Sequence, residues 1–170
     1  MNAIAVVDRN WALGREGALL FNLPTDMRRF KELTTGGILL MGRKTLNSFE
    51  EGHFLPERRN IVITRNKDLV PPGGETVATP QEALALIAKE DSGKAWVIGG
   101  GSVYAALLSQ CERTYLTKVD TVAEGEPDTY FPDLDHLTGW ELEEESNPVW
   151  ENNLSYRFLV YVNRNLNPDA

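Results

Sequence analysis

Residues 95–104 read AWVIGGGSVY, and this stretch indicates the class of fold more clearly than any other. An apolar run passes through three glycines into residues that favour a helix. This order predicts a buried strand over Ala95–Ile98, a turn at Gly99–Gly101 and a helix over Ser102–Ser109. Because strands that alternate with helices favour a parallel sheet covered on both faces, the stretch predicts an α/β fold if the same order recurs elsewhere in the chain.

The alternation does continue outward from this stretch. Apolar runs predict further strands at Ala3–Val7, Ile38–Met41, Asn60–Thr64 and Thr114–Val119. Helices are expected over residues 24–34, 43–49 and 80–90. Towards the C-terminus, Trp140–Glu145 and Tyr156–Val162 alternate without a helix between them, which favours an antiparallel hairpin at a sheet edge. We therefore expect a single α/β domain over residues 1–170, with a mostly parallel central sheet flanked by helices on both faces.

Composition narrows the function classes. The chain has 170 residues, of which 42% are hydrophobic and 25% charged, and its net charge of −8 disfavours binding to nucleic acid or anionic membranes. No apolar run approaches the length of a membrane span. Cys111 is the single cysteine, which excludes a disulfide framework and favours a reducing, cytoplasmic location. His53 and His136 lie far apart in the sequence, so no metal site is expected.

Cationic groups follow the predicted strands of the N-terminal half. Residues 1–67 hold eleven Lys/Arg against seven Asp/Glu. Arg43 and Lys44 follow one strand, Arg65 follows the next, and Gly99–Gly101 would leave backbone N–H groups free after a third. Each feature alone is also typical of an ordinary turn or an exposed basic surface. Because ligands bind at the carboxyl ends of parallel strands, the three together favour a polyphosphate ligand such as a dinucleotide.

Asp26 stands on a helical stripe that should be apolar. Pro24 suits the first turn of a helix, and from there Asp26, Phe30 and Leu33 share one face. The carboxylate either complements the positive end of the helix dipole or binds a ligand. Residues 8–23, which precede this helix, show neither the helical nor the strand periodicity of apolar residues. A loop of that length is uncommon inside a compact domain and often forms a lid or a binding loop.

Several motifs resemble bacterial dihydrofolate reductases. They are LLFNLPTDMRRFK, MGRKT, LPERRN, VIGGGSVY, TYLTKVD and DTYFPD, in this order and at these spacings. The resemblance implies NADPH-dependent reduction of 7,8-dihydrofolate to 5,6,7,8-tetrahydrofolate, with hydride going to C6 and a proton to N5. The product would supply one-carbon metabolism and thymidylate synthesis. It also implies a cytoplasmic monomer that binds antifolates such as methotrexate or trimethoprim.

The resemblance assigns catalysis to Asp26, Thr117 and Phe21. The Asp26 carboxylate would bind N3–H and the 2-amino group of the pterin, with Thr117 as its support. Burial would raise the pKa of Asp26 and suit it to promoting proton transfer. Phe21 departs from the family, which usually has Trp here. Phe has no N–H that could hold a water in the pocket.

The remaining implied contacts divide between substrate and cofactor. The substrate contacts are Ile4, Val6, Met27, Phe30, Phe49, Arg58, Ile98 and Tyr104, with Arg58 holding the α-carboxylate of the glutamate tail. The NADPH contacts are Leu13, Gly14, Gly42, Arg43, Lys44, Thr45, Thr64, Arg65, Gly99, Gly100, Gly101, Ser102 and Val103, with Arg65 reading the 2′-phosphate. A cis peptide at Gly99–Gly100 and a mobile loop over residues 8–23 are also implied.

Two other functions stay open on the sequence. A pyrimidine reductase of riboflavin synthesis shares this fold and the use of NADPH. A catalytically silent folate- or nucleotide-binding protein is the second alternative, kept open by Phe21. The Asp26 segment and Arg58 favour folate, because the glutamate tail of folate needs a cation.

Overall fold

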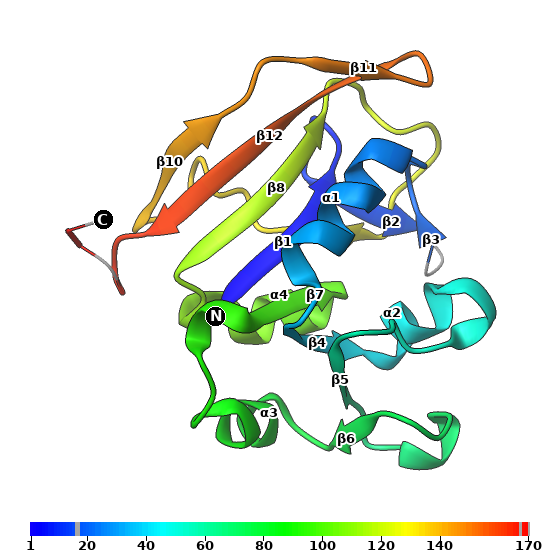
Figure 1. The fold of residues 1–170 in the computed structure, drawn as a ribbon. Coiled ribbons are helices and arrows are strands. Elements are labelled where there is room, and N and C mark those ends of the chain that lie inside the picture. The colour runs from blue at the N-terminus through cyan, green and yellow to red at the C-terminus, as the bar shows by residue number, and fades with distance from the viewer. Residues whose placement is uncertain (16–17, 167, 170) are drawn as a thin grey trace.

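The computed structural model describes residues 1–15, 18–166 and 168–169. Within them a central sheet runs in the order β10–β12–β8–β1–β7–β4–β5–β6, and β11 pairs with β12 (Figure 1). Its strands are β1 Asn2–Val7, β4 Ile38–Gly42, β5 Arg59–Ile63, β6 Glu75–Val77, β7 Ala95–Gly99, β8 Arg113–Val119, β10 Trp140–Glu145, β11 Val149–Glu151 and β12 Leu154–Asn163.

The sheet is parallel except at one edge. β1, β4, β5, β6, β7 and β8 are parallel to their neighbours among one another, whereas β12 is antiparallel to both β8 and β10. This confirms the predicted α/β class and the C-terminal antiparallel hairpin. Two short strands, β6 and β11, were not expected, because three residues are too few to show a period.

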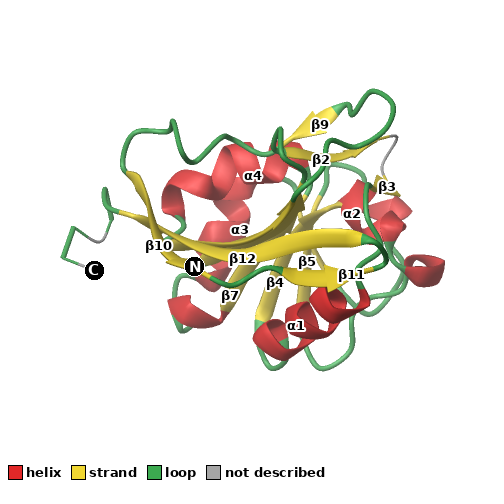
Figure 2. Ribbon diagram, turned by 90° about the horizontal axis from the view of Figure 1, so that it is seen from above, coloured by secondary structure: helices red, strands yellow, loops and turns green. Residues whose placement is uncertain are grey.

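Helices cover both faces of the sheet, as predicted. The α-helices are α1 Pro24–Thr34, α2 Arg43–Ser48, α3 Pro80–Ile87 and α4 Gly101–Leu107. Figure 2 shows α3 and α4 on one side of the sheet and α1 on the other. Ile87 of α3 and Leu107 of α4 pack against Leu40 on their face, and Leu46 of α2 and Leu33 of α1 pack on the opposite face. The short 3₁₀ turns are Glu50–Gly52, Lys67–Leu69, Ser92–Lys94 and Leu108–Gln110.

The expectation of no regular structure over residues 8–23 is wrong for part of that segment. β2 Ala12–Arg15 pairs with β3 Ala18–Leu19 and with β9 Thr129–Tyr130 to form a separate three-stranded sheet. The partner strand β9 is remote in the sequence, so local periodicity carries no sign of the pairing. Residues 16 and 17 lie outside the described residues.

The start of this segment is held by Asp8, whose side chain is 1% exposed. Its carboxylate accepts hydrogen bonds from the backbone N–H groups of Asn10 at 2.8 Å, Ala12 at 2.9 Å and Ala123 at 3.0 Å. Three such donors satisfy a buried carboxylate. Asp8 therefore joins the segment before β2 to the loop that follows β8.

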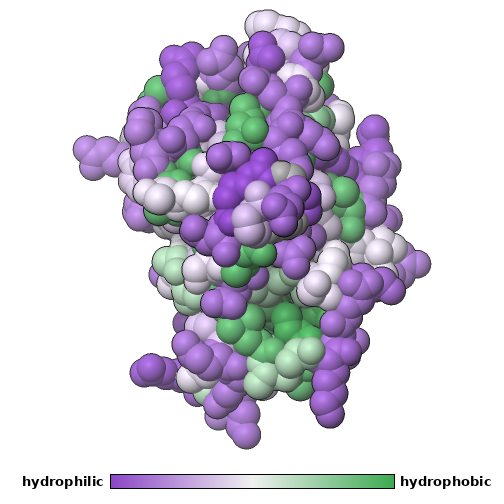
Figure 3. All heavy atoms as spheres, turned by 90° about the vertical axis from the view of Figure 1, so that its left-hand side faces the viewer, coloured by the Kyte–Doolittle hydropathy of each residue, from purple (hydrophilic) through white to green (hydrophobic). Residues whose placement is uncertain are grey.

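One face of the molecule is dominated by hydrophilic residues, and its largest apolar area lies in its lower part (Figure 3). Among the helices of the described residues, none combines the length and the apolar character needed to cross a bilayer.

Candidate active site

Asp26 lies in the first turn of α1 and is only 8% exposed. Thr117 of β8 donates its hydroxyl hydrogen to Oδ1 of Asp26 at 2.5 Å. Burial raises the pKa of Asp26, because removal from water disfavours the charged form. The Thr117 hydrogen bond and the positive charge of Arg29 oppose this rise, and the negative charge of Glu151 adds to it. The site thus contains a carboxyl group that retains a proton at higher pH than an exposed aspartate.

Strand register places an apolar wall beside this carboxyl group. Val6 of β1 is the neighbour of Thr117, and Ile4 lies two residues away on the same side of the strand. Ala3 and Ala5, on the opposite side, are buried, whereas Ile4 and Val6 remain partly exposed. Ile98 of β7 is likewise partly exposed. The predicted substrate residues Ile4, Val6 and Ile98 are therefore available to an apolar ligand.

Along α1, Met27 and Phe30 continue the surface away from Asp26. Met27 is 49% exposed, and Phe30 is partly buried beneath Arg58, whose guanidinium carbon lies 5.9 Å from the ring centre. Arg58 donates to the backbone oxygen of Pro56 at 3.0 Å and to Oγ1 of Thr34 at 3.2 Å. Partial burial lowers the pKa of Arg58, but an arginine stays charged. Arg58 is thus a fixed cation at the side of α1.

Three strand ends meet at one edge of the sheet, as the sequence predicted. Gly42 of β4 pairs with Ile63 of β5, and Met41 pairs with Gly99 of β7. Arg43 and Lys44 follow β4, and Thr64 and Arg65 follow β5. The side chains of Arg43, Lys44 and Arg65 form no hydrogen bond or ion pair with any residue that the structure describes. Cations left without partners at this edge suit a phosphate ligand.

The glycine turn after β7 is closely packed, and its Gly99–Gly100 peptide bond is cis, as expected. A Cβ at Gly101 would lie 2.7 Å from Cγ2 of Thr129, and one at Gly99 would lie 3.0 Å from Oγ1 of Thr45. Gly99 also has a φ of +132°, which disfavours any other residue. Positions 99 and 101 therefore require glycine, and Gly100 and Gly101 remain partly exposed beside the exposed Ser102.

Three residues predicted to contact ligands have side chains that are buried or partly buried in the core. Tyr104 is 3% exposed and donates its hydroxyl hydrogen to the backbone oxygen of Ile4 at 2.5 Å. Val103 is 5% exposed and packs with α3 and α4 residues. Phe49 is partly buried against Leu46 on the α1 face of the sheet. These three residues shape the surroundings of the site.

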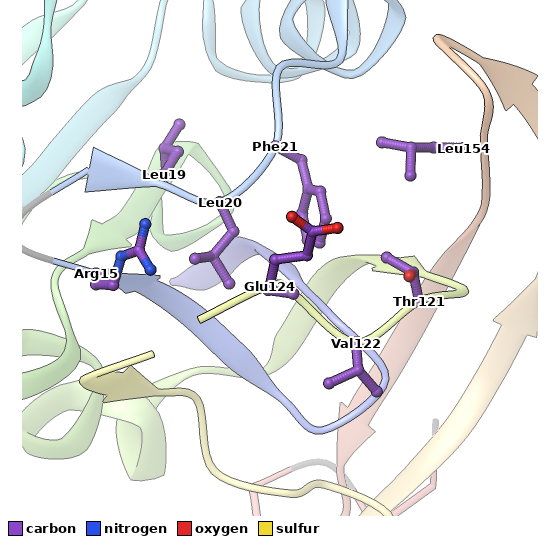
Figure 4. Close-up of a pocket in the computed structure, with 9 residues that line it drawn as sticks. Arg15, Leu19, Leu20, Phe21, Thr121, Val122, Glu124 and Leu154 are labelled. Atoms are coloured by element: carbon purple, nitrogen blue, oxygen red, sulfur yellow. The ribbon is translucent and has the colours of Figure 1, made fainter. Parts of the chain in front are cut away.

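Phe21 lines a cavity of about 450 Å³. It also belongs to the hydrophobic cluster that contains Val6, the strand neighbour of Thr117. Figure 4 shows this cavity between the segment that carries Arg15, Leu20 and Phe21 and the loop that carries Val122 and Glu124. Leu13 packs against the core from β2, and Gly14 pairs with Leu19 and Thr129. Phe21 therefore adjoins the apolar wall beside Asp26, whereas Leu13 and Gly14 belong to β2 of the small sheet.

Comparisons with known proteins identify the family of the chain. The family model described as "Dihydrofolate reductase" matches residues 1–163. The chain belongs to the dihydrofolate reductase family. It is 38% identical over 153 residues to dihydrofolate reductase type 3 of Salmonella typhimurium, covering 90% of this chain and 91% of the relative. It is 34% identical over 164 residues to the dihydrofolate reductase of Bacillus subtilis, covering 95% and 94% of the two chains.

A solved structure of the family gives the same result for the fold. Dihydrofolate reductase from Enterococcus faecalis, complexed with NADP(H) and RAB-propyl, has a TM-score of 0.82 and 31% sequence identity, and the match covers 95% of this chain and 94% of that one. Of the functions that the sequence left open, these matches favour dihydrofolate reductase over pyrimidine reductase.

The sequence motifs missed two charged residues near Asp26. Arg29 is partly buried, with its guanidinium carbon 4.2 Å from the ring centre of Phe158 and 5.9 Å from that of Tyr115. Glu151 of β11 bonds to Thr25, the residue before Asp26. Arg29 lies in a recognised motif, but its stacking partners come from distant strands. Glu151 lies outside every motif, so no sequence signal pointed to it.

Proposed function

We propose that Asp26, supported by Thr117, promotes protonation of N5 while 7,8-dihydrofolate is reduced at C6 by NADPH. This reduction to tetrahydrofolate is the activity of the dihydrofolate reductase family, to which the chain belongs as an oxidoreductase. The observation that carries the proposal is the burial of Asp26 beside the partly exposed Ile4 and Val6. A lone buried carboxyl group requires a partner, and a pterin offers two N–H donors in one plane.

Asp26 acts on the proton side of the reaction. The ionised carboxylate accepts hydrogen bonds from N3–H and the 2-amino group of the pterin and so orients the ring. Its raised pKa keeps a proton available at higher pH than on an ordinary aspartate, which favours protonation at N5. Thr117 holds Oδ1 in place, because its hydroxyl already donates to that atom. Such general acid assistance is typically worth ~10²–10⁴ in rate.

The strand ends fit NADPH. The unpartnered side chains of Arg43, Lys44 and Arg65 would hold its phosphates, with Arg65 at the 2′-phosphate. The crowded turn at Gly99–Gly101 would let the backbone approach the cofactor closely, between Thr45 and Ser102. The other backbone and side-chain contacts would come from Leu13, Gly14, Gly42, Thr64 and Val103. When bound, NADPH supplies the hydride for C6.

The rest of the substrate follows α1. Met27, Phe30 and Phe49 would enclose the benzoyl ring, and Arg58 would bind the α-carboxylate of the glutamate tail. Arg58 suits this role because Pro56 and Thr34 fix its orientation while donors remain on its guanidinium. Antifolates that carry a similar diamino ring, such as methotrexate or trimethoprim, would bind in the same place.

We also propose that the chain acts as a single-domain cytoplasmic monomer. The family match over residues 1–163 supports one domain. The single cysteine, Cys111, is buried and unpaired, which agrees with a reducing compartment.

The deciding experiment follows the absorbance of NADPH in the presence of purified protein. We expect oxidation only when dihydrofolate is added, and tetrahydrofolate as the product. The control is the Asp26→Asn variant under the same conditions. If wild-type protein bound both ligands in calorimetry but oxidised no NADPH, the chain would be a silent binding protein and the proposal would be wrong.

A further inference from the structure

Glu151 contacts the first turn of α1 from the far end of the chain. It is the last residue of β11, the short strand that pairs with β12. Its Oε1 accepts a hydrogen bond from the backbone N–H of Thr25 at 3.1 Å, and its Oε2 accepts one from the Thr25 hydroxyl. Tyr156 of β12 donates its hydroxyl hydrogen to the same carboxylate at 3.3 Å. Both oxygens of Glu151 are therefore used, and all three donors lie on Thr25 or Tyr156.

This contact replaces a cap that α1 lacks. The first N–H groups of a helix have no partner within it, and a polar N-cap side chain usually accepts one of them. The N-cap of α1 is Leu23, which cannot accept a hydrogen bond. Glu151 supplies the acceptor and places a negative charge at the positive end of the helix. Because Thr25 directly precedes Asp26, the contact also fixes the backbone that carries the Asp26 carboxyl group.

Thr117 anchors Asp26 from the opposite side. The Asp26 carboxyl group is bonded to β8 through Thr117, and its backbone neighbour is bonded to β11 through Glu151. Two different strands thus define the position of one turn of helix. A reacting group must be held closely in its productive geometry, and a displacement of about 1 Å can reduce a rate by ~10²-fold.

Two charged groups act directly on Asp26, and further titratable groups act on those two. Glu151 increases the retention of a proton by Asp26, whereas Arg29 favours the ionised form. Arg29 forms no ion pair with any residue that the structure describes and acts through space while stacked on Phe158. Tyr115 on β8 and Glu144 on β10 act on Arg29, Arg28 on α1 acts on Glu151, and Tyr156 on β12 is affected by both Asp26 and Glu151.

We propose that Glu151 is a positioning residue for catalysis, which holds Asp26 in its working geometry through its hydrogen bonds to Thr25. The inference rests on the proposed role of Asp26. Glu151 itself touches neither substrate nor cofactor in this account, and it acts only through the first turn of α1.

The Glu151→Gln variant tests the proposal with little change of shape. The amide oxygen can still accept a hydrogen bond from the Thr25 backbone N–H, and the amide NH2 can donate to the Thr25 hydroxyl, so the main loss is the negative charge. Loss of a nearby negative charge lowers the pKa of Asp26, so the pH at which the rate of hydride transfer falls should move to lower pH. At neutral pH we expect kcat to fall about 3- to 10-fold, while the KM for NADPH stays unchanged.

Two further variants separate the hydrogen bond from the charge. Thr25→Val removes the hydroxyl that Glu151 accepts from and keeps a branched side chain, so kcat should fall by a similar factor. Thr25→Ser retains the hydroxyl and should restore most of the loss. Glu145→Gln is the matched control: Glu145 lies on β10, where it pairs with Arg157 at 3.6 Å, and its removal deletes the same charge from the same sheet.

A titration that requires no turnover keeps the two proposals distinguishable. Carboxyl ¹³C chemical shifts of labelled aspartate report the pKa of Asp26 in ligand-free protein. We expect a lower midpoint in Glu151→Gln than in wild type and in Glu145→Gln. An unchanged Asp26 midpoint together with an unchanged pH profile in Glu151→Gln would overturn the inference while leaving the role of Asp26 intact. Wild-type protein without turnover, but with the expected shift of midpoint, would instead overturn the proposed function.

Discussion

The Asp26→Asn substitution separates the proton chemistry of the site from its shape. Asparagine occupies the same volume, and its Oδ1 can still accept the hydrogen bond that Thr117 now donates at 2.5 Å. The packing of α1 should therefore persist, and the loss should come from the missing carboxyl group. We expect the rate of hydride transfer at neutral pH to fall ~10²–10⁴-fold, the usual contribution of a positioned acid or base. The affinity for NADPH should change little, since the proposed phosphate contacts lie at other strand ends.

The same variant should be more stable than wild type in the absence of ligands. The pKa of Asp26 is raised in the folded protein above its ordinary value of 3.8, so folding favours the protonated form. The resulting stability is complete below the unfolded pKa and is lost as pH rises through the folded pKa. Each unit by which the pKa of Asp26 is raised lowers the free energy of unfolding by ~1.4 kcal/mol at pH values above the folded pKa. Asparagine does not titrate and escapes that loss.

Stopped-flow single-turnover kinetics and urea unfolding measure the two effects. The urea concentration at the midpoint of unfolding should be higher for Asp26→Asn than for wild type at neutral pH, and the two midpoints should converge below about pH 4. An Asp26→Asn enzyme with wild-type hydride transfer at neutral pH would refute the assignment of the acid. A variant less stable than wild type at neutral pH would refute the claim that burial of this carboxyl group is unfavourable.

Three further substitutions test neighbouring parts of the site. Thr117→Val removes a donor to the ionised carboxylate of Asp26, so the pH at which the rate of hydride transfer falls should move to higher pH, opposite to Glu151→Gln. The free energy of unfolding at neutral pH, measured with urea, should drop by about 1–3 kcal/mol. A shift of the pH profile to lower pH would contradict this. Arg65→Ala should raise the KM for NADPH about tenfold or more in steady-state assays, because hydrogen bonds to charged groups contribute ~1.5–3 kcal/mol. The KM for NADH should stay nearly unchanged, since only NADPH has the 2′-phosphate. Equal changes for both cofactors would remove Arg65 from that role. Phe21→Trp introduces an N–H donor and should raise the rate at alkaline pH about two- to fivefold through a held water, and an unaltered pH profile would show that no such water takes part.

The central elements of the fold were predictable because their signals are local. The strand, glycine turn and helix over residues 95–104 follow from apolar runs and turn residues, and Pro24 marks the start of α1 correctly. The strands β2 and β9 were missed for the opposite reason. Their pairing joins Gly14 to Thr129, and neither segment has a period of its own.

The candidate site was predictable only in part. Asp26 and the cations after β4 and β5 lie within motifs, and the parallel sheet brings their strand ends to one edge. The burial of the Tyr104 side chain was not foreseen, since it depends on a hydrogen bond from α4 to the backbone of Ile4, which is remote in the sequence. Glu151 was missed altogether, because a glutamate in a polar hairpin carries no local sign of the helix end that it contacts.

The role of Asp26 as the acid is best measured by the pH dependence of hydride transfer in wild-type enzyme, beside the ¹³C titration of Asp26. We expect single-turnover oxidation of NADPH by dihydrofolate to slow as pH rises, with a midpoint that follows the raised pKa of Asp26 and disappears in Asp26→Asn. A rate that does not depend on pH, or a midpoint that survives in Asp26→Asn, would contradict it.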